Sequence, residues 1–298
     1  MRYLKFKKPE YTKLIKTAYY AFASGNLMKF KIYIETSFTI NYEKTNHINY
    51  LICLFNLKKY KEFLYHFDKL EKADEISDLL FLKALCLKEI GKVADSIELF
   101  EYTYKVFDNK ESLYALAYIY DEFNDYGISE DYYKKYLEVA SDDINAMICL
   151  GSLYEKHNEN EKALEVFLKA LDIDSTFQTL NYNIAVSFAK LGRIEDAIKS
   201  YEEEIRINPD FSHSYLNLGL LYEDINLDKA LEIYTEGIDK TNDSYLWYNV
   251  GCIYSRIGKT NKAKEYIIKS FELDPELIDY SKDDEDLINY YKELKNNS

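Results

Sequence analysis

The chain has 298 residues, with 38 lysines and arginines against 52 aspartates and glutamates, and a formal net charge of −14. Its nine glycines and three prolines are too few for turn-rich β-sandwiches or barrels, so the composition excludes those folds. Hydrophobic residues make up 47% and aromatic residues 16% of the chain, which excludes a disordered protein and indicates a helical one.

Charge and hydropathy also limit the class of partner. A net charge of −14 disfavours nucleic acid, because binding to phosphates requires a basic surface. No run of about 18 apolar residues occurs, so we expect no membrane span. The four cysteines lie far apart and form no CxxC pair, which is typical of reduced thiols in a cytoplasmic protein: Cys53, Cys86, Cys149 and Cys252.

The sequence repeats itself with a period of about 34 residues. Three of the later segments align without a gap, and residues 212–243 align after a deletion between Tyr222 and Ala230. Each has an apolar first half and an alanine followed by an apolar or aromatic residue. In chain order, the predicted segments are 11–43, 44–76, 77–109, 110–143, 144–177, 178–211, 212–243 and 244–277.

The earlier segments keep the spacing but depart more from the pattern. The first two place Phe30 and Phe63 where the later ones have alanine, and the second has Leu51 where a small residue is expected. The third and fourth conform better, through these residues: Ala84, Gly91, Phe100, Ala117, Tyr120 and Tyr133.

The last four segments carry the fullest pattern. It consists of an aromatic, a small and an aromatic residue in the first half, then alanine, an aromatic or apolar residue and a small residue, with proline ending two of the segments. Its members are Gly151, Tyr154, Ala163, Phe167, Ala170, Ala185, Phe188, Ala197, Tyr201, Pro209, Tyr215, Gly219, Tyr222, Ala230, Tyr234, Trp247, Gly251, Tyr254, Ala263, Ile267, Ser270 and Pro275.

This pattern resembles the tetratricopeptide repeat (TPR) family, whose 34-residue unit is a helix–turn–helix. The resemblance covers residues 11–277 and is strongest over 144–277. It implies an all-α, right-handed superhelical solenoid of about eight units over residues 1–277, followed by a capping helix at 278–298.

Glycine placement supports the resemblance on physical grounds, because a glycine inside a helix costs about 1 kcal/mol relative to alanine. Seven of the nine glycines occupy two places in the repeat. We expect Gly151, Gly219 and Gly251 to lie where the two helices of a unit cross closely. The others are expected in the turn between those helices, with a positive φ: Gly25, Gly91, Gly192 and Gly258.

Residues 278–298 begin with an acidic run at 283–286, followed by apolar residues at helical spacing. Carboxylates at the start of a helix and an apolar stripe behind them predict the capping helix that closes such an array. A metal site is the alternative interpretation of the acidic run, although it lacks the glycine and the spacing of a calcium loop.

No catalytic pattern is present, so we expect a protein that is not an enzyme and has no cofactor or metal. The four histidines are dispersed without an HExxH motif, and neither a glycine-rich phosphate loop nor a GxSxG elbow occurs: His47, His66, His157 and His213.

In the family, ligands bind in a concave groove formed by the first helix of each unit, so the resemblance implies a peptide site there. The tyrosines of this groove either anchor a ligand through their rings or pack between adjacent first helices. Its asparagines hydrogen-bond either to the backbone of a bound peptide or to nearby residues of the chain itself. The acidic members favour a basic or neutral peptide. The candidates are Tyr114, Tyr118, Asp121, Glu122, Glu155, Tyr182, Asn183, Asn217, Tyr248 and Asn249.

Some members of the family clamp a C-terminal carboxylate with lysines, asparagines and an arginine. Of these, only one asparagine position is filled here, so the carboxylate would lack its counter-charges and we expect no such clamp. The sequence therefore predicts a cytoplasmic, non-catalytic scaffold or adaptor that binds a protein or peptide segment. The alternatives are a regulatory receptor for a short signalling peptide, and a structural module that self-associates as a homodimer through the first two units.

Overall fold

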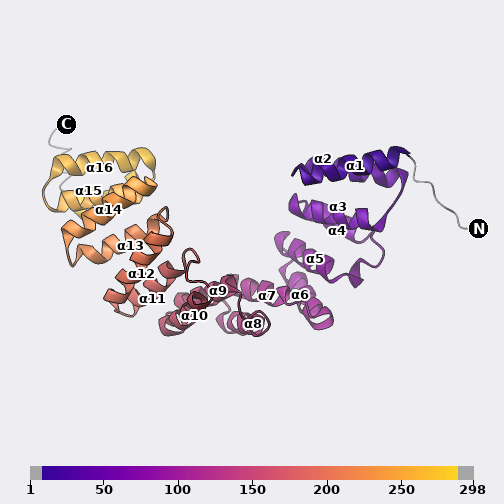
Figure 1. The fold of residues 1–298 in the computed structure, drawn as a ribbon, viewed down its shortest axis with the longest axis horizontal. Coiled ribbons are helices and arrows are strands. Elements are labelled where there is room, and N and C mark those ends of the chain that lie inside the picture. Colours follow the sequence, from indigo (N-terminus) through magenta and orange to yellow (C-terminus); the bar gives the residue numbers. More distant parts are fainter. Residues whose placement is uncertain (1–8, 288–298) are drawn as a thin grey trace, which may run out of the picture. The chain divides into compact units, whose positions relative to one another are not determined.

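The computed structural model describes residues 9–287, and within this range every regular element is a helix (Figure 1). The predicted all-α class is therefore confirmed. The chain divides into two compact parts, Met1–Ser141 and Asp142–Ser298. We call their described residues, 9–141 and 142–287, the N-terminal half and the C-terminal half. None of the helices in the described range is long and apolar enough to cross a membrane.

Short turns join the helices of each half into successive pairs. The helices of the N-terminal half are α1 (Pro9–Ala23), α2 (Leu27–Ile40), α3 (Lys44–Asn56), α4 (Tyr60–Phe67), α5 (Ser77–Glu89), α6 (Val93–Phe107), α7 (Glu111–Glu122) and α8 (Tyr126–Val139). Those of the C-terminal half are α9 (Ile144–Lys156), α10 (Asn160–Ile173), α11 (Leu180–Lys190), α12 (Ile194–Ile207), α13 (Ser212–Glu223), α14 (Leu227–Thr241), α15 (Ser244–Arg256), α16 (Thr260–Leu273) and α17 (Leu277–Tyr280).

Each half is a stack of helical pairs. The two helices of a pair pack against each other, and the second helix of one pair packs against the first helix of the next. The alanine of the repeat pattern is fully buried in all four pairs of the C-terminal half, at Ala163, Ala197, Ala230 and Ala263. Buried small residues let the two helix backbones approach, which explains why the pattern keeps alanine here.

The glycines of the first helices lie against large side chains of the second helices. A Cβ atom on Gly151 would lie 2.3 Å from the Phe167 ring, and one on Gly219 would lie 2.1 Å from the Tyr234 ring. Both rings are fully buried. The close helix crossing expected from the sequence is thus present, and the aromatic residue of the second helix fills the space that glycine leaves.

In every pair except α13–α14, the turn between the helices uses a left-handed residue, as expected for the turn glycines. Gly91 has φ +84°, and the other three turn glycines also have positive φ. Where a pair lacks this glycine, Lys58, Asn124 and Asn158 adopt the same conformation, with φ between 56° and 61°. Asparagine tolerates it better than most residues, whereas lysine carries a steric cost.

The first two pairs accommodate large rings in place of alanine. Phe30 and Phe63 are fully buried, and Phe30 packs against the rings of Tyr19 and Phe22 at centroid distances of 5.8 and 5.1 Å. The second helix of the second pair, α4, has only eight residues, and a 3₁₀ turn at Ala73–Glu75 follows it.

The C-terminal half ends in short helical turns. After α17, 3₁₀ turns span Ser281–Asp283 and Glu285–Leu287. Of the predicted capping helix at 278–298, residues 288–298 lie outside the described range. In the described part, the acidic residues of the run lie in or between these turns, and Leu277 and Leu287 pack against α15 and α16.

Candidate functional site

Hydrogen bonds between side chains join adjacent first helices within each half. In the C-terminal half, Asn217 Nδ2 on α13 donates to the Tyr182 hydroxyl on α11 at 3.1 Å. In the N-terminal half, Asn49 Nδ2 on α3 donates to the Tyr19 hydroxyl on α1 at 2.7 Å. Both asparagines therefore bond to the preceding repeat, in agreement with the local-bond alternative considered from the sequence.

The Tyr182 ring forms part of a half-buried aromatic cluster. It meets the rings of Tyr201, Phe211 and His213 at centroid distances of 5.8, 5.1 and 6.3 Å. Burial raises the pKa of the Tyr182 hydroxyl, and the hydrogen bond from Asn217 lowers it to a smaller degree. Because packing fixes the ring on several sides, Tyr182 contributes a rigid wall to the face of α11 and α13.

Glu155 on α9 supplies a half-buried carboxylate beside this wall. Ser187 on α11 donates its hydroxyl to Glu155 Oε1 at 2.8 Å. Burial raises the pKa of Glu155, while the Ser187 hydroxyl and the charge of Lys190 lower it. Among the described residues, no cation forms a salt bridge with this carboxylate. A partly desolvated carboxylate of this kind favours contact with a cationic group or an N–H donor.

Apolar side chains lie on the same face. Leu220 on α13 is 60% exposed, and Val186 and Leu216 are half-buried. Asn183 on α11 is also half-buried, and its side chain forms no hydrogen bond within the described range. Leu220, Val186 and Leu216 were not among the predicted candidates. Their positions on the first helices could have indicated them. We call Glu155, Tyr182, Asn183, Val186, Leu216, Asn217 and Leu220 the α9–α13 face.

The last two predicted candidates of the C-terminal half lie elsewhere. Tyr248 on α15 is only 3% exposed, because the segment after α16 covers it. Its hydroxyl donates to Asp284 Oδ2 at 2.6 Å, and its ring lies 5.8 Å from that of Tyr280. Asn249 is half-buried and forms a side-chain hydrogen bond with the Tyr234 hydroxyl on α14 of the preceding pair. This bond lowers the pKa of the hydroxyl, but burial raises it by more.

The remaining candidates lie on α7 in the N-terminal half. Tyr114 packs against the rings of Tyr133 and Tyr136 at 5.8 and 5.4 Å, on the second helix of its own pair and not between first helices. Tyr118 is 46% exposed, with Lys88 Nζ 4.8 Å from the centre of its ring.

The acidic candidates of α7 lie close to the same lysine or along the same helix. Lys88 Nζ lies 2.9 Å from Glu122 Oε2, so this cation is shared between the Tyr118 ring and a carboxylate. Asp121 is half-buried on α7. These candidates form a separate surface within the N-terminal half.

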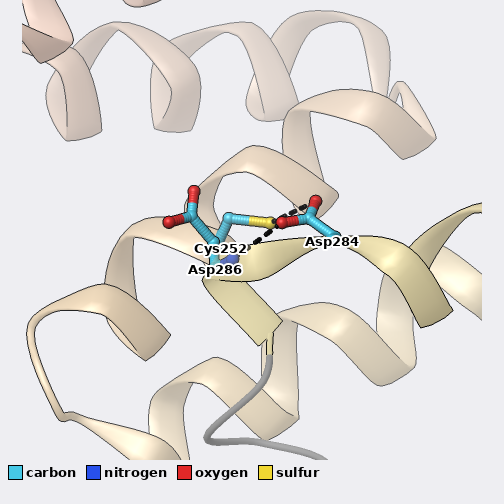
Figure 2. Close-up of side chains that lie close together, drawn as sticks. All are labelled: Cys252, Asp284 and Asp286. Carbon is cyan, nitrogen blue, oxygen red and sulfur yellow. Dashed lines mark hydrogen bonds between the residues drawn. The ribbon is translucent and has the colours of Figure 1, made fainter.

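Three potential metal ligands meet where the chain returns to α15. One ligand atom each from Cys252, Asp284 and Asp286 lies within 4.8 Å of the others (Figure 2). The Cys252 thiol donates to Asp284 Oδ2 at 3.8 Å, and burial strongly raises its pKa. Arg256 Nη1 lies 3.9 Å from Asp286 Oδ2 and already supplies a positive charge. A protonated thiol and a neighbouring arginine favour a hydrogen-bonded cap over a cation site.

Two histidines that we expected to lie apart are in fact neighbours. His47 on α3 and His66 on α4 have ring centroids 6.0 Å apart, so the expectation of four dispersed histidines was wrong for this pair. Tyr42 hydroxyl and His47 Nδ1 are 2.8 Å apart, whereas the buried His47 Nε2 has no partner among the described residues. Burial lowers the pKa of both rings.

Comparison with known families matches the repeats directly. A family model described as "TPR repeat" matches residues 187–225, and two described as "Tetratricopeptide repeat" match residues 114–176 and 244–277. The C-terminal part of a TPR repeat-containing protein from Cytophaga hutchinsonii shares the fold, with a TM-score of 0.65 and 14% identity. That likeness covers 76% of this chain and 95% of the other.

A second solved structure, YrrB, is titled "a TPR protein with an unusual peptide-binding site". It has a TM-score of 0.50 and 17% identity, over 60% of this chain and 93% of YrrB. Like the first, it shows likeness of fold alone.

Curated relatives match only in part. Protein O-mannosyl-transferase TMTC3 from Homo sapiens is 26% identical over 48% of this chain and 18% of its own length. Protein bimA from Emericella nidulans is 25% identical over 67% of this chain and 25% of its own length. The peroxisomal targeting signal receptor of Kluyveromyces lactis is 28% identical over 34% of this chain and 18% of its own length. This chain thus matches a quarter or less of these relatives.

Proposed function

Because the chain belongs to the tetratricopeptide repeat family, we propose that it is a non-catalytic scaffold or adaptor, located in the cytoplasm, that binds a segment of another protein on the α9–α13 face. The observation that carries the proposal is the combination on this face of exposed Leu220 with half-buried Glu155 and Asn183. An extended segment would place an apolar side chain on Leu220 and bond its backbone to the amide of Asn183.

The chemistry of the α9–α13 face favours a basic or neutral segment. Glu155 has Ser187 as a hydroxyl donor and no salt bridge within the described part, so a lysine, an arginine or a backbone N–H of the ligand would complete its bonding. The net charge of −14 would also speed the approach of a cationic segment. YrrB, titled "a TPR protein with an unusual peptide-binding site", supports a peptide as the class of ligand.

We infer that this chain does not itself transfer a glycosyl group. The match to O-mannosyl-transferase TMTC3 covers only 18% of that protein, and of the two histidines that lie together, His47 is buried and His66 half-buried against aromatic rings. The sequence contains no catalytic motif that would replace what the match leaves out.

A random peptide library displayed on phage tests the proposal. Peptides selected on the full chain are synthesised, and their Kd is measured by fluorescence anisotropy with the wild type and with Leu220→Asp. We expect Leu220→Asp to weaken binding about ten-fold or more, because a charge replaces an apolar contact. The matched control is Leu168→Asp on the second helix α10, where the leucine is 40% exposed. Equal affinity of wild type and Leu220→Asp would refute the proposed face.

A second candidate function, self-association as a homodimer, is favoured by apolar side chains on the first pair. Tyr20 on α1 is 77% exposed, and Met28 and Ile32 on α2 are each about half exposed. Sedimentation of wild type and of Ile32→Asp at several concentrations tests it. A dimer that Ile32→Asp dissociates supports this function, and a monomer at all concentrations contradicts it.

A further inference from the structure

The segment that follows α16 folds back onto α15. Leu277 and Leu287 are buried there in a cluster with Tyr248, Cys252 and Ile267. The segment consists of the four-residue helix α17 and two 3₁₀ turns of three residues each. Few backbone hydrogen bonds hold such turns together, so the packing of its leucines and the contacts of its carboxylates keep it in place.

Two carboxylates meet polar groups of α15: Asp284, which directly precedes the second turn, and Asp286 within it. Figure 2 shows Asp284 hydrogen-bonded to Cys252. Asp284 Oδ2 accepts hydrogen bonds from the Tyr248 hydroxyl at 2.6 Å and from the Cys252 thiol at 3.8 Å. Asp286 Oδ2 lies 3.9 Å from Arg256 Nη1, and Arg256 Nη2 also lies 2.7 Å from Glu223 Oε2 on α13. The surface that the segment covers thus offers two hydrogen-bond donors, one cation and apolar side chains of α15 and α16.

The segment takes the place that a further first helix would have in the array. Tyr182 on α11 receives a hydrogen bond from Asn217, 35 residues later, on the next first helix. Tyr248 is the corresponding tyrosine of α15, and its hydroxyl bonds to Asp284, 36 residues later. At the equivalent place, the chain up to Leu287 forms two short turns, whereas the inner pairs have a helix of three turns or more.

We propose that Tyr248, Cys252 and Arg256 form a second binding surface, for an acidic segment of a partner protein that carries a leucine after its carboxylates. In the structure this surface holds the chain's own residues of that type, Asp284 to Leu287. The partner's segment exchanges with them and binds through the same donors, cation and apolar side chains.

Competition between the chain's own segment and the partner's segment determines how tightly a free segment binds. A tethered segment acts at an effective concentration on the order of millimolar, so a free segment of equal intrinsic affinity binds the wild type weakly. The apparent Kd equals the intrinsic Kd divided by the fraction of molecules in which the surface is open. Loosening the chain's own segment therefore tightens binding of the free one.

The test uses a fluorescent peptide with the sequence of residues 279–287 and the full chain. We expect Leu287→Ala to bind it at least about ten-fold more tightly than the wild type, since the fully buried Leu287 no longer holds the segment. Adding Arg256→Ala to Leu287→Ala should lose this gain. A peptide with asparagine in place of its aspartates at 284 and 286 should not bind.

Further measurements keep the test decisive. If Leu287→Ala fails to fold, as judged by circular dichroism, Asp284→Asn keeps the leucine and should still tighten binding about three-fold or more. Loosened variants that bind no better than the wild type, or binding that survives the loss of Arg256, would overturn the proposal. So would a wild-type dimer formed by exchange of this segment between two copies, which sedimentation detects. Leu220→Asp should not affect this assay, so its outcome is independent of the α9–α13 face.

Discussion

Replacement of Gly219 by alanine tests how closely the two helices of a repeat approach. The added Cβ would lie 2.1 Å from Tyr234 Cε1 and 2.5 Å from Tyr234 Cζ, whereas two carbon atoms in contact lie about 3.5–4.0 Å apart. The Tyr234 ring is fully buried, and its hydroxyl donates to Glu223 Oε1 at 2.8 Å. To accept the methyl group, the ring has to move by more than an ångström and give up part of this bond.

The expected loss in the free energy of unfolding has three contributions. Overpacking of a buried site costs about 1–3 kcal/mol. Weakening of a hydrogen bond to a carboxylate costs up to about 1.5–3 kcal/mol. The better helix propensity of alanine returns about 1 kcal/mol. We therefore expect Gly219→Ala to lower the free energy of unfolding of the C-terminal half by about 2 kcal/mol.

Urea unfolding measures this difference. The fluorescence of Trp247, the single tryptophan of the chain, reports on the C-terminal half, and circular dichroism reports on all helices. Gly127→Ala on α8 is the matched control, because no atom lies within 4 Å of its added Cβ, and it should be neutral or slightly stabilising. In a Tyr234→Ala background, Gly219→Ala should not lower the free energy of unfolding further, because the ring that the added Cβ would meet is absent. A Gly219→Ala variant as stable as the wild type would refute the close crossing.

Three further predictions concern stability. Lys58 has φ +56°, so Lys58→Gly should raise the free energy of unfolding by about 1 kcal/mol in urea titrations, and an unchanged or lower midpoint would contradict this. Burial lowers the pKa of His47, so its contribution to stability is present above about pH 6.5 and is lost as the pH falls toward the folded-state pKa. His47→Phe should therefore make the free energy of unfolding depend less on pH in this range. An identical pH dependence of wild type and variant would contradict this. The fully buried Glu204 Oε1 accepts the backbone N–H of Thr179, which has φ +69°, at 2.7 Å. Glu204→Ala should therefore lower the midpoint of thermal unfolding by several degrees, equivalent to about 1–3 kcal/mol, and more than Glu204→Gln does.

Repeat spacing made the fold predictable from sequence. A helix interior penalises glycine, so Gly151 and Gly219 indicated close crossings, and the turn glycines indicated left-handed turns. Lys58 also has a left-handed backbone conformation, but a lysine, unlike a glycine, does not indicate it in the sequence. The division into eight repeats and the capping helix remain predictions of the sequence.

The candidate site was less predictable, because a position in the repeat does not determine what covers a side chain. Tyr182 and Tyr248 hold the same repeat position, yet Tyr248 is buried by the turns after α16. Those turns depend on Leu287 and Asp284, which the repeat pattern does not include. Leu220, in contrast, is 60% exposed on α13, although it was not among the predicted site residues.

The pairing of His47 and His66 also depends on tertiary packing. They lie on the two helices of one predicted repeat, 19 residues apart in the sequence, and no short motif connects them. Only the short helix α4 and its packing on α3 bring the rings together.

The measurement that tests the central claim most directly is the affinity of library-selected peptides for the wild type, Leu220→Asp and Leu168→Asp. Binding of a segment on the α9–α13 face predicts that Leu220→Asp loses about ten-fold or more in affinity, while Leu168→Asp binds as the wild type does. Peptides that bind all three proteins equally well, or that lose affinity only with Leu168→Asp, would contradict it.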